Sequence, residues 1–156
     1  MEPAVGAKAP SFTLTADTGE EFSLKTLLGS WVVLYFYPAD MTPTCTNQAC
    51  SFRDNMELLA RENVTVVGIS PDDVDSHLKF RSKNNLNFIL LADPEKKVLE
   101  KYNTWKLKKM YGREYMGVVR TTFLIDPKGI IRKVWNKVKV ATQIDDITTT
   151  LLQMKQ

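Results

Sequence analysis

Cys45 and Cys50, the only cysteines of the chain, lie where a predicted buried strand gives way to a helix. The apolar run 31–37 predicts the strand, and a helix is expected over residues 43–62. Thr42 suits the N-cap of that helix, and the proline that follows suits its first position. Cys45 therefore falls in the first turn, where unpaired N–H groups and the helix dipole favour an anion. A thiol placed there should ionise more easily than a free one, so the sequence predicts one activated cysteine.

The spacing of the two cysteines conflicts with a disulfide in an intact helix. Five residues of α-helix separate the two Cα atoms by roughly 8 to 9 Å, whereas a disulfide usually needs them within about 7 Å. Cys45 lies on the apolar stripe of the helix and Cys50 on its more polar flank. Two interpretations remain open: either the thiols are unrelated and Cys50 is a small buried hydrophobe, or the first helical turns unwind during function. The second interpretation predicts a folded reduced form and a locally unwound oxidised form.

Other cysteine chemistries need residues that the sequence does not provide. A Cys–His nucleophile would need a histidine, and the only one, His77, is expected to decorate a helix surface or cap. A structural zinc site needs four ligands, which two cysteines and one distant histidine do not supply, so no metal or cofactor is expected. Arg120 is the remaining candidate for stabilising a thiolate, because it interrupts the apolar strand predicted over residues 118–125 and stays charged.

Length and composition indicate one globular domain, residues 1–156. The chain is 44% hydrophobic and 25% charged, with a net charge of +3. Its basic residues are scattered among acidic ones, which argues against a nucleic-acid partner. The first residues lack the apolar stretch of a signal peptide, and the longest apolar run is too short to span a bilayer. We therefore expect a cytoplasmic protein, a compartment in which cysteines serve redox or catalytic roles more often than structural bridges.

The order of predicted elements indicates an α/β fold. Strands are expected at 11–14, near 21–22, and at 31–37, 64–70, 88–91, 118–125 and 130–135; helices are expected at 43–62, 71–84, 93–102 and 142–154. The segment 103–117, rich in charge and aromatics, is expected to be a loop. Strands that alternate with helices predict a central mixed sheet flanked by helices. A cysteine that opens the helix after a central strand fits a thioredoxin-like fold with an added N-terminal β-hairpin.

The residues around the first cysteine resemble a known family. Pro38, Thr42 and Cys45 stand in the Pro-x-x-x-Thr-x-x-Cys pattern of peroxiredoxins, and Arg120 falls where that family has its active-site arginine. The segment Cys-Thr-x-x-Ala-Cys, with its second cysteine, is similar to the subfamily called bacterioferritin comigratory protein, or peroxiredoxin Q. Thr44 departs from the pattern, because many relatives carry glycine there.

The resemblance implies reduction of hydrogen peroxide and organic hydroperoxides, without a cofactor. Cys45 would be the nucleophile that becomes a sulfenic acid. Thr42 and Arg120 would supply hydrogen-bond donors in the transition state, and Pro38 would shield the sulfur from water. Cys50 would resolve the sulfenic acid by forming an intramolecular disulfide. Thioredoxin or a similar dithiol would then reduce that disulfide, and a cysteine pair on one chain permits a monomer.

Each of these residues also has a plainer interpretation, and two other functions use the same cysteines. Thr42 can be a simple cap, Pro38 a strand stop and Arg120 an exposed charge at a strand end. A thiol–disulfide oxidoreductase acting on proteins would need neither Thr42 nor Arg120. A non-catalytic binding module would react with peroxide only slowly.

Overall fold

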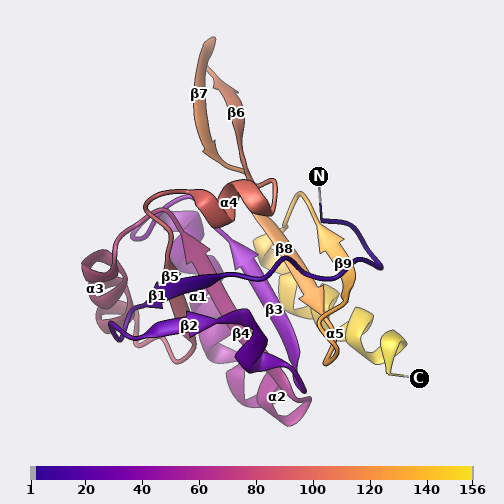
Figure 1. The fold of residues 1–156 in the computed structure, drawn as a ribbon. Helices are drawn as coiled ribbons and strands as arrows, with labels where there is room; N and C mark the ends of the chain where they lie inside the picture. Colours follow the sequence, from indigo (N-terminus) through magenta and orange to yellow (C-terminus); the bar gives the residue numbers. More distant parts are fainter. Residues whose placement is uncertain (1–2, 156) are drawn as a thin grey trace.

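The computed structural model describes residues 3–155, so Met1, Glu2 and Gln156 of the predicted domain lie outside the described residues. Its centre is a seven-stranded sheet in the order β2-β1-β5-β4-β3-β8-β9 (Figure 1). The strands are β1 (Thr13–Ala16), β2 (Glu21–Ser23), β3 (Trp31–Phe36), β4 (Val64–Ser70), β5 (Ile89–Ala92), β8 (Thr121–Ile125) and β9 (Ile131–Trp135).

The sheet is mixed, as the sequence predicts. Strands β3, β4 and β5 run parallel, while β8 pairs antiparallel with β3, and β9 with β8. The N-terminal hairpin β1–β2 extends the other edge, because β1 pairs antiparallel with β5. The prediction of a mixed sheet with an N-terminal hairpin is therefore confirmed.

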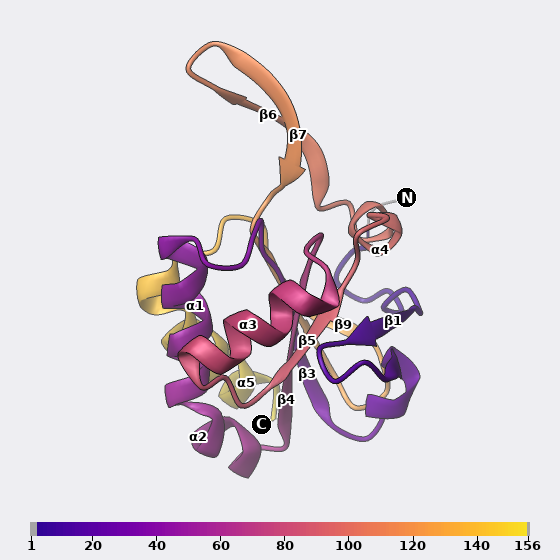
Figure 2. The same cartoon turned by 90° about the vertical axis from the view of Figure 1, so that its left-hand side faces the viewer.

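Helices cover both faces of the sheet. They are α1 (Pro43–Asp54), α2 (Met56–Arg61), α3 (Val74–Asn84), α4 (Lys97–Lys101) and α5 (Gln143–Met154), with short 3-10 turns at Leu24–Leu27 and Val140–Thr142. Figure 2 shows α1, α2, α3 and α5 on one side of the sheet and α4 on the other. Because side chains alternate along a strand, Val33 and Tyr35 of β3 pack with the first group, whereas Leu34 and Phe36 pack on the α4 side. Side chains of the buried strand β3 therefore contribute to the hydrophobic core on both faces of the sheet.

The helix predicted over residues 43–62 is interrupted at Asn55. This residue has φ −114° and ψ 10°, outside the helical range, and separates α1 from α2. Its side-chain amide donates to the Ser51 carbonyl at 2.8 Å. Asparagine side chains compete in this way with the backbone hydrogen bonds of a helix, which explains the break.

The segment predicted as a loop, 103–117, forms a second sheet instead. Strands β6 (Trp105–Met110) and β7 (Arg113–Val118) pair antiparallel into a hairpin that projects from the rest of the molecule (Figure 1). Its turn residues Tyr111 and Gly112 both have positive φ, 51° and 77°, as the two-residue turns of tight hairpins require. The predicted strand 118–125 is consequently split, with β7 ending at Val118 and β8 starting at Thr121.

Within residues 3–155, none of the helices has the length and apolar character needed to cross a membrane.

Gly68→Ala is expected to destabilise the fold. Gly68 lies opposite Tyr35 in the β3–β4 pair, and a Cβ atom there would lie 2.9 Å from the Tyr35 ring and hydroxyl. Because Tyr35 is buried in a packed core, its ring has little room to move, and we expect a loss of about 1–3 kcal/mol. Urea unfolding measures this loss.

Gly117→Ala is the matched control for that measurement. Its Cβ would meet the flexible Lys108 side chain at 3.0 Å on the projecting hairpin, so a change within about 0.5 kcal/mol is expected. Equal effects of the two substitutions would contradict the close packing inferred around Gly68.

Candidate active site

The candidate site lies at the carboxyl end of β3, where the chain enters α1. Cys45 is the third residue of α1, and only 2% of its surface is exposed. The antiparallel neighbour β8 starts beside this end of β3, because Thr121 pairs with Phe36. Arg120, the residue just before β8, is therefore carried to the start of α1.

Arg120 contacts the cysteine directly. Its Nη2 donates to Cys45 Sγ at 3.2 Å, and its Nη1 donates to Gln48 Oε1 at 2.5 Å. The arginine lies in the short link between β7 and β8, so the prediction that it sits inside a continuous strand is wrong. A guanidinium group keeps its charge at any physiological pH, and here it can stabilise negative charge on the sulfur.

Gln48 accepts a hydrogen bond from Arg120 and is itself held by Gln143; neither glutamine was predicted from the sequence. Gln48 is fully buried one turn after Cys45, and its Nε2 donates to Gln143 Oε1 at 3.1 Å. In return Gln143 Nε2, at the start of α5, donates to the Gln48 carbonyl at 3.1 Å. A polar amide side chain on the helix three residues after Cys45 was the available signal, because such a group needs polar partners when it is buried.

Thr42 and Pro38 belong to the loop between β3 and α1. Thr42 occupies the N-cap position as predicted, but its hydroxyl donates to the Ala39 carbonyl at 3.1 Å and makes no capping bond. The N–H groups of the first turn therefore have no side-chain cap, which leaves them as donors for an anion near Cys45. Pro38 follows Tyr37 directly and is half-buried.

Cys50 lies farther along the same helix and is half-buried. Its Sγ is 3.8 Å from Asn84 Oδ1, at the end of α3, and the Asn84 carbonyl accepts from Arg53 Nη1 at 2.7 Å. Both cysteines are free, and α1 is continuous across them. A disulfide between them consequently requires α1 to unwind, because the helix keeps their Cα atoms roughly 8–9 Å apart.

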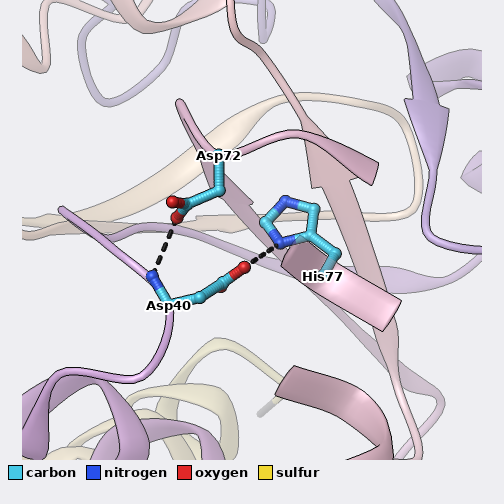
Figure 3. Close-up of side chains that lie close together, drawn as sticks. All are labelled: Asp40, Asp72 and His77. Carbon is cyan, nitrogen blue, oxygen red and sulfur yellow. Dashed lines mark hydrogen bonds and ion pairs between the residues drawn. The ribbon is translucent and has the colours of Figure 1, made fainter. Parts of the chain in front are cut away.

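His77 is buried within α3, so the expectation that it decorates a helix surface is wrong. Its Nδ1 lies 2.7 Å from Asp40 Oδ2 (Figure 3). Its Nε2 lies 2.9 Å from the Leu91 carbonyl of β5. The backbone N–H of Asp40 donates to Asp72 Oδ2 at 2.8 Å. Asp40 belongs to the same loop as Pro38 and Thr42, so this cluster joins the candidate site to α3.

Hydrogen bonds join Asp40 to both Asp72 and His77. Their candidate ligand atoms lie within 4.8 Å of one another. Ligands on one tetrahedral zinc ion would be about 3.3 Å apart, which is longer than the 2.7 Å between His77 and Asp40. Burial by itself lowers the pKa of His77, but the hydrogen bond and charge of Asp40, the Leu91 carbonyl and Asp72 together outweigh it and raise the pKa above 6.5.

A buried cysteine at a helix start with an arginine on its sulfur, held at the end of a central strand, is the arrangement of a thiol-based redox enzyme. Residues 5–134 match the AhpC/TSA family, and the chain belongs to this family. Within it, the chain is a peroxiredoxin of the Bcp/PrxQ type, a class of thiol peroxidase. It is 47% identical to Peroxiredoxin Bcp of Bacillus subtilis, over all of this chain and 99% of that protein.

Solved structures agree with this assignment. A PrxQ cysteine-to-serine mutant from Xylella fastidiosa superposes with a TM-score of 0.94, at 28% identity over 100% of this chain and 99% of that one. The bacterioferritin comigratory protein of Xanthomonas campestris gives a TM-score of 0.87, at 32% identity over 93% of this chain and 92% of that one. The prediction of a thioredoxin-like peroxiredoxin fold is thereby confirmed.

Proposed function

We propose that the protein reduces hydrogen peroxide and organic hydroperoxides through Cys45, within the single domain expected from the sequence. The observation that carries this proposal is the 3.2 Å contact between Arg120 Nη2 and Cys45 Sγ at the start of α1. The Xanthomonas campestris relative is described for its alkyl peroxide reduction activity, which supports the same substrate class.

The proposed first step transfers one oxygen atom to sulfur. The Cys45 thiolate attacks one peroxide oxygen, an S–O bond forms and the O–O bond breaks. The departing oxygen takes a proton and leaves as water or an alcohol, and Cys45 becomes a sulfenic acid. Charge moves from sulfur to the leaving oxygen, so donors fixed along that line stabilise the transition state more than the ground state. Arg120, the N–H groups of the first turn and the Thr42 hydroxyl are proposed as these donors, while Pro38 limits access of water.

In the proposed second step Cys50 resolves the sulfenic acid. Its sulfur attacks Cys45 Sγ, an S–S bond forms and water leaves. The first turns of α1 must unwind for this step, and Cys50 must leave Asn84. A dithiol such as thioredoxin then reduces the disulfide, so we propose that the reaction runs in the cytoplasm, where such reductants act. Because both cysteines belong to one chain, the cycle needs no second copy.

Stopped-flow mixing with hydrogen peroxide or an alkyl hydroperoxide tests the proposal, with tryptophan fluorescence as the signal. We expect rapid single-turnover oxidation of Cys45, and steady peroxide consumption once thioredoxin is added. Reduction of insulin disulfides, measured in parallel, separates this function from a thiol–disulfide oxidoreductase. Efficient insulin reduction with slow peroxide oxidation would favour the second function.

Cys50→Ser is expected to leave the first step intact and to stop the cycle. The sulfenic acid forms at Cys45, but the chain has no other cysteine to resolve it. We therefore expect one equivalent of peroxide consumed per chain, with no steady turnover on thioredoxin, in an assay of peroxide remaining. A small thiol added in excess should restore turnover. Unchanged steady turnover without that thiol would remove the resolving role from Cys50.

A further inference from the structure

The loop that carries the proposed catalytic residues is attached to α3 through one buried carboxylate. Asp40 lies midway between Pro38 and Thr42, and its side chain is 1% exposed. Oδ1 accepts from the Tyr37 hydroxyl at 2.7 Å. Oδ2 accepts from the Ser76 hydroxyl at 2.8 Å. It also lies 2.7 Å from His77 Nδ1, as Figure 3 shows. Ser76 and His77 belong to α3, and Tyr37 directly precedes Pro38, just after β3.

The geometry requires both nitrogens of His77 to donate. Nε2 faces the Leu91 carbonyl, which can only accept, so this nitrogen carries a proton. Nδ1 faces a carboxylate oxygen that already accepts from Ser76, so this contact needs a proton too. A neutral imidazole has only one N–H. Its other nitrogen would then face either the Asp40 carboxylate or the Leu91 carbonyl with a lone pair, which is unfavourable. The contacts are therefore all favourable only when the imidazole is protonated.

The loop needs this attachment because its backbone is strained. Met41, the residue after Asp40, has φ 66°, the left-handed region that residues other than glycine rarely adopt. The Asp40 N–H is fixed by Asp72 Oδ2 at 2.8 Å, and Asp72 is held in turn by the Ser70 hydroxyl at 2.7 Å. Such a conformation persists only where the surrounding contacts determine it. The buried bonds of Asp40 are the contacts that do so here.

We propose that protonated His77 is a positioning residue for the peroxide reaction, and that its ion pair with Asp40 holds the Pro38–Thr42 loop against Cys45. Loss of the proton turns a nitrogen lone pair on either the Asp40 carboxylate or the Leu91 carbonyl, which weakens the attachment of Asp40 to α3, lets the loop relax and slows the oxidation of Cys45. This inference rests on the proposed function of Cys45. It assigns a supporting role in the peroxide reaction to a residue outside the Pro-x-x-x-Thr-x-x-Cys pattern.

The direction of the pH effect follows from the groups that face His77. These are Asp40 in the loop, Tyr37 just after β3 and Asp72 before α3, with the Leu91 carbonyl on β5. Burial raises the pKa of Tyr37 well above 10, so it stays neutral. The pKa of His77 is raised above 6.5, so the pair stabilises the fold fully below that pH. Its contribution is lost as the pH rises through the folded pKa.

Two substitutions at His77 separate its charge from its packing, both in a Cys50→Ser background that isolates the peroxide step. In His77→Asn the amide Nδ2 takes the place of Nδ1 and still donates to Asp40, but it cannot titrate; its oxidation rate should stay within about threefold of the parent. His77→Leu leaves the buried carboxylate without this donor. We expect it to oxidise roughly 10- to 100-fold more slowly, because small displacements of catalytic groups have effects of that size.

The pH profile distinguishes positioning from a merely structural role. In the parent, the rate constant for Cys45 oxidation should fall at alkaline pH, and in His77→Asn this fall should be absent. Ser76→Ala, which removes the other donor to Oδ2, is the matched control and should keep the fall. The proposal is overturned if His77→Leu oxidises at the parent rate, or if His77→Asn keeps the alkaline fall.

NMR of the unsubstituted protein tests the protonation state without any peroxide. Since the chain has a single histidine, its two ring nitrogens can be observed without ambiguity. Because the pKa of His77 is raised above 6.5, both should carry a proton at about pH 6. Urea unfolding at increasing pH should show the stability advantage over His77→Asn declining. A neutral imidazole at about pH 6 would overturn the inference. If the unsubstituted protein consumed no peroxide, the proposed function would be overturned instead. The NMR result does not depend on that function.

Discussion

Cys45→Ser is expected to abolish peroxide consumption. Serine keeps the size of the side chain, but its hydroxyl does not ionise under conditions where a thiol does, so no nucleophile of comparable strength remains. We expect the rate constant for oxidation to fall by more than about 10³-fold, because loss of a nucleophile removes the reaction itself. The fold should survive, since the Cys45 side chain is small and its hydrogen bond from Arg120 can pass to the hydroxyl.

The matched control for this variant is the same cysteine-to-serine substitution at Cys50, about one and a half helical turns after Cys45. Cys50→Ser changes a half-buried thiol on the same helix and should retain the first turnover. Peroxide remaining and sulfenic acid trapped by a dimedone-type reagent report both results. If Cys45→Ser consumed one equivalent of peroxide while Cys50→Ser did not, the two cysteines would have exchanged roles.

Arg120→Met is expected to slow the oxidation of Cys45 roughly 10²- to 10³-fold, which is the cost of removing one preorganised donor from a site where charge develops. Methionine fills similar space without the charge or the donors. Arg120→Lys keeps the charge but lacks the planar guanidinium group that donates to Cys45 and Gln48 at the same time, so an intermediate rate is expected. Single-turnover rate constants measured with hydrogen peroxide test both variants.

Arg132→Met provides the matched control. Arg132 is a partly buried arginine on the adjacent strand β9, but its hydrogen bonds go to Asp126 and Met154. Removing it should affect stability slightly and leave the oxidation rate unchanged. The electrostatic role of Arg120 would be contradicted if both methionine variants reacted at the same rate as the unsubstituted protein.

The parts of the site that lie close together in the sequence were predictable. The apolar run of β3 and the proline that opens α1 are local signals, and they place Cys45 in the first helical turn. The mixed sheet follows from the order of strands and helices. Arg120 could be suspected because a charge inside an apolar segment needs an explanation, although its position between β7 and β8 was not foreseen.

The remaining parts depend on contacts between distant segments. Gln48 and Gln143 are 95 residues apart and become partners only when α1 and α5 pack on the same face of the sheet. His77 was misjudged because its helix is rich in polar residues, while its two partners come from the β3–α1 loop and β5. The hairpin β6–β7 was missed because charges obscure its alternation, although Tyr111-Gly112 offered a turn signal.

The discontinuity at Asn55 limits how far a conformational change in α1 can spread. Helices melt cooperatively because each residue's hydrogen bond depends on its neighbours. Residues 43–54 form one such cooperative segment, and the next segment, α2, begins at Met56 and contributes its buried Leu59 to the core. In the proposed resolving step, melting that starts at Cys45 can therefore stop before α2, so that Leu59 stays packed in the core while the proposed disulfide forms.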